Sequence, residues 1–256
     1  MGKKISAMTI LTTPPYDAEL VAAIPDVEDI AIPIRNIPSE IFMNRFTGGI
    51  YKDDLWNANQ FHYPWRFLVI GGTGVLSAQT TIANHPGIVR IGANGANTGY
   101  TLYSAENNIL IEGGEVTELI VNFVTSTNLA CVFGFSDQFA NFPNALVDGV
   151  YINVAGTTLS GRCRNNSTET ITGTTYTIST GTWYRISIIV SADASRVDFY
   201  VYDAAGTQLW TNFVITNIPT QRVTGHGLVA IKTTAGAANL LDVDFMSLIF
   251  GKQLTR

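Results

Sequence analysis

Acidic side chains at short spacing are the first residues in this sequence that could do chemistry, because glycoside hydrolysis uses two carboxylates that flank the scissile bond. Glu112, Glu115 and Glu118 are three residues apart and two glycines interrupt them, so one strand face cannot present all three. Asp242 and Asp244 are two residues apart, and we expect them together on the solvent face of a last strand. No third acid follows at that spacing. The sequence therefore predicts a protein that is not an enzyme and has no catalytic residues.

Histidine and glycine patterns give little support to a metal or nucleotide site. His62, His85 and His226 are far apart and lack the spacing of histidine metal motifs, so we expect each at a turn or a rim. The glycine-rich run 92–99 resembles a phosphate loop, but the Lys-Ser/Thr pair that should follow it is missing. We expect this run to be a long β-turn region.

No metal site and no cofactor are predicted, although a calcium ion is kept as an alternative. Its ligands would be Asp137, Asp148 or Asp242, but no calcium-loop spacing supports such a site. Two cysteines, Cys131 and Cys163, are too few for a disulfide framework. We expect both to be buried free thiols, with a single bridge as the minor alternative.

Polar and aromatic side chains alternate with apolar ones along two neighbouring predicted strands. Tyr151 and Asn153 in the first strand, and Arg162 and Arg164 in the second, lie between positions expected to be buried, so all four should face outward. A long loop follows the preceding strand and is the best candidate for a variable recognition loop. Its candidate ligand-binding residues are Asp137, Gln138 and Asn141. The mixture suits a sugar-like ligand, while a solvated face or a protein contact is the more common use of such a composition.

Short strand-like runs separated by Gly and Asn turns make up the chain after Thr47. The clearest pair is 183–190 and 196–202, joined by a short turn. The alternation of period two places seven apolar side chains of this pair in an interior: Tyr184, Ile186, Ile188, Val190, Val197, Phe199 and Val201. No helical period of more than two turns is present after Thr47, so the pattern predicts an all-β sandwich or barrel.

The composition agrees with a β protein and excludes several classes. Charged residues make up 14% of the chain, against about 25% in typical globular proteins, and 46% of residues are hydrophobic. The net charge is -5 and no cluster of Lys or Arg is present, so we expect no nucleic-acid binding. No apolar run reaches the roughly 18 residues of a membrane helix, so we expect no membrane insertion. Residues 5–10 are too polar for the core of a signal peptide.

The first 45 residues differ from the rest, because they hold five of the nine prolines and a cluster of acidic residues. The prolines exclude a long helix or a central strand, and the segment cannot bury much surface by itself. We therefore predict an extended arm at 1–45 that gains order by docking on something else, followed by one domain at 46–256. An arm wrapped on its own domain is the alternative.

Two runs near the C-terminus resemble the concanavalin A-like lectin/glucanase (laminin-G-like) family. They are Gly-Thr-Trp-Tyr-Arg-Ile at 181–186 and Asp-Ala-Ser-Arg-Val-Asp-Phe-Tyr-Val at 193–201. Ile218-Pro219, a turn at 225–228 and a terminal strand at 241–245 fit the same pattern, and the resemblance covers about 81–250. It implies an antiparallel jelly-roll sandwich and a binding role. The Glu-x-Asp-x-Glu strand of the glucanase members is absent, so the resemblance does not imply hydrolysis.

The N-terminal segment is similar to an arm found on bacteriophage virion proteins, especially tail fibres. The match runs from Lys4 to Phe42 and includes Lys-Ile-Ser at 4–6, Glu-Leu-Val at 19–21 and Pro-Ser-Glu-Ile-Phe at 38–42. The residues that would attach the arm to the particle are Ile5, Leu20, Val21, Ile32, Ile34, Ile41 and Phe42.

This second resemblance implies a structural protein of the virion: a tail fibre, a baseplate component or a capsid decoration. Its expected partners are other virion proteins, further copies of itself, with a trimer favoured, and a host surface polysaccharide. The expected localisation is the virion. A polysaccharide-degrading enzyme and a cellular lectin or adhesin are the alternatives.

Overall fold

The computed structural model describes a single set of β-strands and the turns between them. The described residues are 43–44, 48–53, 65–71, 74–80, 82, 85, 87–93, 95–104, 109–139, 146–232 and 238–249. The predicted arm lies outside them except for Met43–Asn44, and all seven predicted attachment residues, Ile5, Leu20, Val21, Ile32, Ile34, Ile41 and Phe42, lie outside them.

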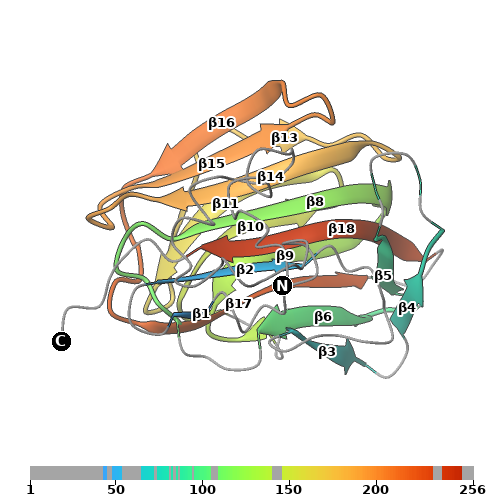
Figure 1. Cartoon of the computed structure of the whole chain (residues 1–256), viewed down its shortest axis with the longest axis horizontal. Coiled ribbons are helices and arrows are strands. Elements are labelled where there is room, and N and C mark those ends of the chain that lie inside the picture. Colours follow the sequence, from blue (N-terminus) through green and yellow to red (C-terminus); the bar gives the residue numbers. More distant parts are fainter. Residues whose placement is uncertain are drawn as a thin grey trace, which may run out of the picture.

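Two nine-stranded antiparallel sheets are stacked face to face (Figure 1). Sheet I runs in the order β1-β2-β18-β8-β14-β15-β16, and β4 and β5 extend it beside β18. Its strands are β1 Met43–Asn44, β2 Gly48–Asp53, β4 Gly74–Ala78, β5 Val89–Ala93, β8 Val116–Thr125, β14 Trp183–Val190, β15 Val197–Tyr202, β16 Gln208–Val214 and β18 Asn239–Ile249.

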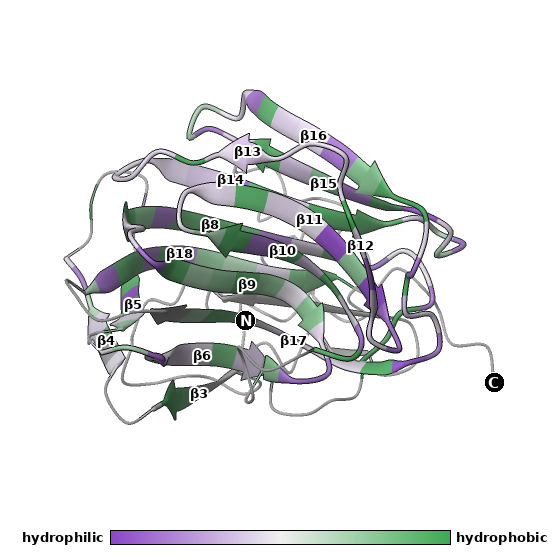
Figure 2. Ribbon diagram, turned by 180° about the vertical axis from the view of Figure 1, so that it is seen from behind, coloured by the Kyte–Doolittle hydropathy of each residue, from purple (hydrophilic) through white to green (hydrophobic). Residues whose placement is uncertain are grey.

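Sheet II runs in the order β12-β11-β10-β9-β17-β6-β3, with β13 beside β11 and β7 beside β17 (Figure 2). Its strands are β3 Trp65–Ile70, β6 Thr98–Ser104, β7 Ile109–Leu110, β9 Leu129–Ser136, β10 Gly149–Ala155, β11 Thr158–Asn165, β12 Thr168–Ile171, β13 Tyr176–Thr177 and β17 Val223–Lys232. The predicted all-β sandwich is confirmed. No helix in the described part of the chain is long and apolar enough to cross a membrane.

The core lies between the sheets and follows the alternation of the sequence. All seven predicted interior residues of β14 and β15 are buried in one apolar cluster: Tyr184, Ile186, Ile188, Val190, Val197, Phe199 and Val201. Sheet II contributes Val150, Ile152 and Val154 from β10 to the same cluster. At Gly161 in β11, an added Cβ would lie 2.5 Å from the ring of Phe199, so a glycine is what lets the two sheets approach at this point.

Cys131 and Cys163 are both buried and free, as expected. They lie in the core cluster and contribute apolar volume rather than a crosslink. Burial raises the pKa of the Cys131 thiol to about 12 and also raises the pKa of Cys163, so both stay protonated at neutral pH.

The prediction that His226 lies at a turn or rim is wrong. Residues 225–228 belong to the long strand β17, and the His226 side chain is fully buried between Phe133 and Phe135. Its Nε2 lies 2.6 Å from Thr117 Oγ1, and that hydroxyl donates its own proton to the Ser247 carbonyl at 2.7 Å. Nε2 must therefore donate to Thr117. The glycines on either side of His226 suggested a turn. Gly227 instead allows β17 to lie close to β6, because a Cβ at this position would meet the β6 backbone.

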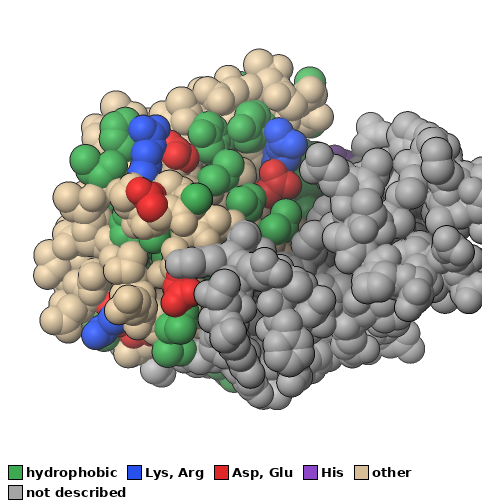
Figure 3. Space-filling model, turned by 60° about the vertical axis from the view of Figure 1, so that its left-hand side comes forward, with side chains coloured by type: hydrophobic (Ala, Val, Ile, Leu, Met, Phe, Trp, Pro, Cys, Tyr) green, Lys and Arg blue, Asp and Glu red, His purple; other side chains and the backbone are tan. Residues whose placement is uncertain are grey.

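Charged side chains are few, and several of those that the structure describes are neighbours of opposite sign. Figure 3 shows this on one side of the molecule, where each visible Lys or Arg lies close to an Asp or Glu among neutral and apolar side chains. Part of the small charged fraction of the sequence therefore appears in the fold as ion pairs, such as Arg90 with Asp242 and Arg196 with Asp198.

Candidate functional site

Sheet II presents four of the predicted ligand-binding residues on one outer face. Tyr151 and Asn153 belong to β10, and Arg162 and Arg164 belong to β11. The register pairs Tyr151 with Arg162, and Asn153 with Ser160, so these side chains share the face opposite the core. The predicted side of each strand is confirmed, while the ligand-binding role of these residues stays a prediction.

The hairpin from β11 to β12 adds a carboxylate to this face. Asn166 and Ser167 both have positive φ values, 47° and 66°, as a two-residue hairpin turn requires. That turn sets Glu169 directly opposite Arg164. Sequence reasoning missed Glu169, although the Asn-Asn-Ser segment after Arg164 is a hairpin signal that could have placed it there.

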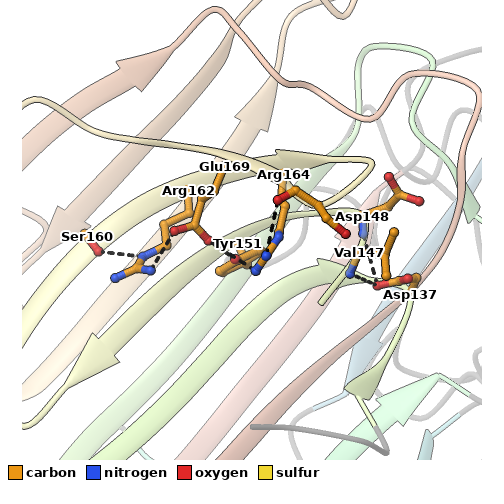
Figure 4. Close-up of polar contacts among 9 residues, drawn as sticks. Asp137, Val147, Asp148, Tyr151, Ser160, Arg162, Arg164 and Glu169 are labelled. Carbon is orange, nitrogen blue, oxygen red and sulfur yellow. Dashed lines mark hydrogen bonds and ion pairs between the residues drawn. The ribbon is translucent and has the colours of Figure 1, made fainter. Parts of the chain in front are cut away.

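Glu169 is the centre of the arginine cluster, which we define as Tyr151, Arg162, Arg164 and Glu169 (Figure 4). Its Oε1 accepts a hydrogen bond from the Tyr151 hydroxyl at 2.5 Å, and its Oε2 accepts one from Arg162 Nη1 at 2.9 Å. Arg164 Nη1 lies 3.9 Å from Oε1, which is ion-pair distance but too long for a hydrogen bond. One carboxylate is therefore shared by two guanidinium groups.

The two arginines are held by further bonds within the hairpin. Arg162 Nε donates to Ser160 Oγ at 3.2 Å, and Arg164 Nη2 donates to the Ser167 carbonyl at 3.3 Å. The side chains of Arg162 and Arg164 are 26% and 22% exposed, so they are supported by the sheet and still reach solvent.

Tyr151 lies on the predicted face but is only 2% exposed, so it cannot offer its ring to a ligand in this structure. Burial raises the pKa of its phenol, and the hydrogen bond to Glu169 raises it further. Tyr151 therefore remains a neutral donor at physiological pH and acts as a support that orients Glu169.

A buried apolar cluster lies on the same side of sheet II, at the middle of the sheet. It consists of Val132, Phe139, Leu146, Tyr151 and Val229, all buried and in mutual contact. In Figure 2, which views the molecule from this side, hydrophilic residues are found on β11 and β12 at the margin of the sheet. The polar part of the face is therefore at the β11–β12 margin, beside an apolar centre.

Asp137, a predicted ligand residue, has a structural role in the loop that follows β9. Its Oδ1 accepts hydrogen bonds from the amides of Val147 and Asp148, each at 3.2 Å. Gln138 follows Asp137, and the backbone amide of Gln138 donates to Ser136 Oγ at 3.2 Å. Asn141 lies outside the described residues. The structure thus brings Tyr151, Asn153 and the two arginines together but uses Asp137 to close the loop.

The expectation that Asp242 and Asp244 lie on a solvent face is wrong, because both are buried by partners. Arg90 donates to both carboxylate oxygens of Asp242, at 2.6 and 2.8 Å, and these hydrogen bonds raise the pKa of Arg90. Asp244 accepts from His85 Nδ1 at 2.9 Å, and the His85 ring stacks on Trp183 with centroids 3.9 Å apart. The period-two pattern gave no sign of these partners, which come from segments 152 and 159 residues away.

The three aspartates considered for calcium do not form one site. Asp242 lies in sheet I and is bound by Arg90, whereas Asp148 accepts from the Asn166 amide and from Arg222 Nε, each at 2.8 Å. Within the described residues, no group of three or more His, Cys, Asp or Glu side chains is arranged to hold a metal ion.

Comparison with known proteins assigns the chain to a family. Residues 84–244 match the model of the family described as SO2946-like, C-terminal domain. The chain belongs to the SO2946-like family. No match was found among curated protein sequences. The crystal structure of SO2946 from Shewanella oneidensis MR-1, titled as a protein of unknown function, is similar with a TM-score of 0.65 and 20% identity, over 82% of this chain and 90% of that one.

Lectins and glucanases share the fold of this SO2946-like chain. A lichenase from a mouse hindgut metagenome has a TM-score of 0.52 and 10% identity, over 78% of this chain and 98% of its own. The winged bean acidic lectin, solved with methyl-α-D-galactose, has a TM-score of 0.54 and 10% identity, over 79% and 98%. These likenesses confirm the predicted concanavalin A-like jelly roll, and at such identities they show the fold alone.

Proposed function

We propose that this SO2946-like chain is a carbohydrate-binding structural protein that uses the outer face of sheet II without hydrolysing its ligand. The arginine cluster is the observation that carries the proposal. It presents partly exposed guanidinium donors, with Asn153 on the neighbouring strand, and such a combination suits the polar groups of a sugar.

Binding without hydrolysis is supported by how the carboxylates are used. A glycosidase needs an acid and a second carboxylate on either side of the bond it cleaves. Glu169 is occupied by Tyr151 and Arg162, and Asp242 and Asp244 are occupied by Arg90 and His85.

A glycan array probed with the full chain tests this proposal. We expect binding to a subset of glycans, loss of that binding in Arg162→Ala, and no release of reducing ends from any bound polysaccharide. An array without a bound glycan would contradict the binding role. Release of reducing ends that disappears in Asp242→Asn would instead identify a polysaccharide-degrading enzyme.

We further propose that the chain is part of a bacteriophage virion, as a tail fibre, baseplate component or capsid decoration, and that it works as a homo-oligomer. The support is the similarity of residues 4–42 to the arms of virion proteins, and a rigid, weakly charged sandwich suits an exposed appendage. A cellular lectin or adhesin is the competing role for the same glycan-binding domain.

Mass spectrometry of purified particles tests the virion proposal. The chain should be present in a fixed copy number, and deletion of residues 1–42 should prevent its incorporation. A truncated chain that still assembles onto particles would show that the arm is not the anchor. Absence of the intact chain from particles would favour the lectin or adhesin.

A further inference from the structure

We infer that the glycan taken by the arginine cluster is acidic and carries carboxylate or sulfate groups. This inference rests on the proposed glycan-binding function and names the substrate class of the same site. It follows from counting donors and acceptors in the cluster and from the position of its one carboxylate.

The cluster has more donors than acceptors. The two guanidinium groups carry ten N–H protons between them, by the known chemistry of arginine, with five on each. Only one hydrogen bond of 2.9 Å joins either of them to Glu169, and two longer ones go to Ser160 and to the backbone of Ser167. The Nε of Arg164 is buried and has no hydrogen-bond partner. A ligand that supplies acceptors is therefore the chemical complement of this site.

Each oxygen of Glu169 already accepts one hydrogen bond from inside the cluster. Tyr151 approaches one carboxylate oxygen and Arg162 the other. A neutral sugar hydroxyl donates as well as accepts, so a site for neutral sugars needs free acceptors beside its donors. The cluster offers more unused donors than acceptors, because three of the ten N–H groups donate within the fold, and this favours a ligand whose groups only accept, as carboxylates and sulfates do.

The charge balance leads to the same ligand class. Two positive groups face one negative group, which leaves the cluster with one excess positive charge, and the adjoining Arg222 and Asp148 neutralise each other at 2.8 Å. Arginine pairs with carboxylates and with tetrahedral oxyanions through two parallel hydrogen bonds, which are stronger than bonds between neutral groups. The partial exposure of both arginines allows a chain of sugars to reach them from the β11–β12 margin.

Titration calorimetry with matched ligands tests the inference on the full chain. The probes are oligogalacturonate, the same oligomer with its carboxylates methyl-esterified, dextran sulfate, and unmodified dextran. We expect one acidic probe to bind and its uncharged counterpart to bind at least about tenfold more weakly, because each lost charge-assisted hydrogen bond weakens binding by about that factor. Raising the salt concentration should weaken the acidic probe further.

Two variants of the cluster and two controls on the other sheet locate the binding. Arg162→Gln and Arg164→Gln should each lower affinity for the acidic probe at least about tenfold. Arg185→Gln is the stringent control, because Arg185 in sheet I also has a buried Nε without a partner but stands alone over the Tyr202 ring. Arg196→Gln is the second control, since Arg196 is already paired with Asp198. Neither control should change the affinity.

Failure of the inference is distinguishable from failure of the proposed function. Equal binding of charged and esterified probes, or loss of binding in Arg185→Gln, would overturn the acidic ligand at this cluster and leave glycan binding in place. Binding confined to neutral glycans on the array would do the same. If no glycan of either kind binds, both proposals are wrong.

Discussion

The outer faces of the two sheets use arginine differently. On sheet I each arginine has its own separate neighbour: Arg90 donates two short hydrogen bonds to Asp242, and Arg196 lies 2.6 Å from an oxygen of Asp198. Arg185 has an aromatic neighbour instead, with its guanidinium carbon 4.3 Å from the centre of the Tyr202 ring. These are closed arrangements in which the positive charge is balanced or covered within the fold.

On sheet II two arginines share one carboxylate. Arg162 forms the hydrogen bond to Glu169, while Arg164 remains 3.9 Å away. In a chain with so few charged residues, such an unequal ratio is what distinguishes a candidate binding surface from a structural ion pair. The comparison teaches that the number of charges on a face matters less than how many cations share one carboxylate.

The largest expected effect is a loss of folding stability when the core between the two sheets is disrupted, because both outer faces depend on that core. Phe199→Ala should lower the free energy of unfolding by about 3–5 kcal/mol, because Phe199 is fully buried against Gly161 of the other sheet. The glycine has no side chain that could fill the cavity left by the ring. Chemical denaturation followed by tryptophan fluorescence measures the loss. A change below about 1 kcal/mol would mean that the two sheets are not packed through this contact.

The pH dependence of folding stability tests the buried hydrogen bond between His226 of sheet II and Thr117 of sheet I. Burial lowers the pKa of His226 to about 3, whereas an unfolded histidine titrates near about 6.5. Below about pH 6.5 the unfolded chain binds a proton that the folded chain does not, so this residue makes stability fall as pH falls towards about 3, by up to about 1.4 kcal/mol per pH unit.

The matched variant is His226→Gln, whose side-chain amide can still donate to Thr117 but does not titrate. Urea denaturation at several pH values should show a shallower slope between about pH 6 and pH 4 for the variant than for the parent chain. Identical slopes would show that His226 is not held neutral in the core.

One pair of charge-removing variants sharpens the contrast between the faces directly. Asp242→Asn should destabilise the fold by about 1–3 kcal/mol, because it leaves Arg90 without its carboxylate in a largely buried pair. Glu169→Gln should change stability by at most about 1 kcal/mol, since its two arginine partners are partly exposed and Gln can still accept from Tyr151.

The same pair should behave in the opposite way towards an acidic glycan. Glu169→Gln removes the one negative charge of the cluster and should leave affinity equal or higher, while Asp242→Asn should leave it unchanged at temperatures where the variant is folded. Differential scanning calorimetry and titration calorimetry measure the two properties. A large loss of stability in Glu169→Gln would show that the cluster is structural.

The smallest effect is expected at Arg196. Arg196→Gln removes an exposed ion pair and the stacking of its guanidinium 4.1 Å above Phe213, on an outer strand that is largely open to solvent. We expect no measurable change in melting temperature, because exposed pairs contribute little. A clear drop would mean that the cations of sheet I contribute more than the geometry indicates.

The strand faces could be predicted from the sequence, because alternation with period two is local. Val197, Phe199 and Val201 needed only their own spacing to be assigned to the core, and Arg162 and Arg164 were assigned to an outer face in the same way. Polar partners could not be predicted, because they are set by distant segments. Asp242 and Asp244 show the limit: their spacing was readable, but Arg90 and His85 come from another part of the chain.

The same limit applied within the candidate site. Glu169 is only five residues from Arg164, yet its place depends on two left-handed residues in the turn, and a single shift of register would have moved it to the other side of β12. Asp137 looked like a free ligand because its partners, the amides of Val147 and Asp148, carry no side-chain signal in a sequence.

The closure of the loop after β9 by Asp137 has a consequence for how binding would be detected. Asp137 holds the amides of Val147 and Asp148, and Asp148 in turn holds the amide of Asn166 in the turn that presents Glu169. These hydrogen bonds connect the loop to the hairpin. A ligand that rigidifies the hairpin should therefore slow deuterium uptake at Val147 and Asp148, even though neither amide belongs to a residue that touches the ligand. The loop would report occupancy of the site, and hydrogen–deuterium exchange mass spectrometry would detect it without a dye or tag on the protein.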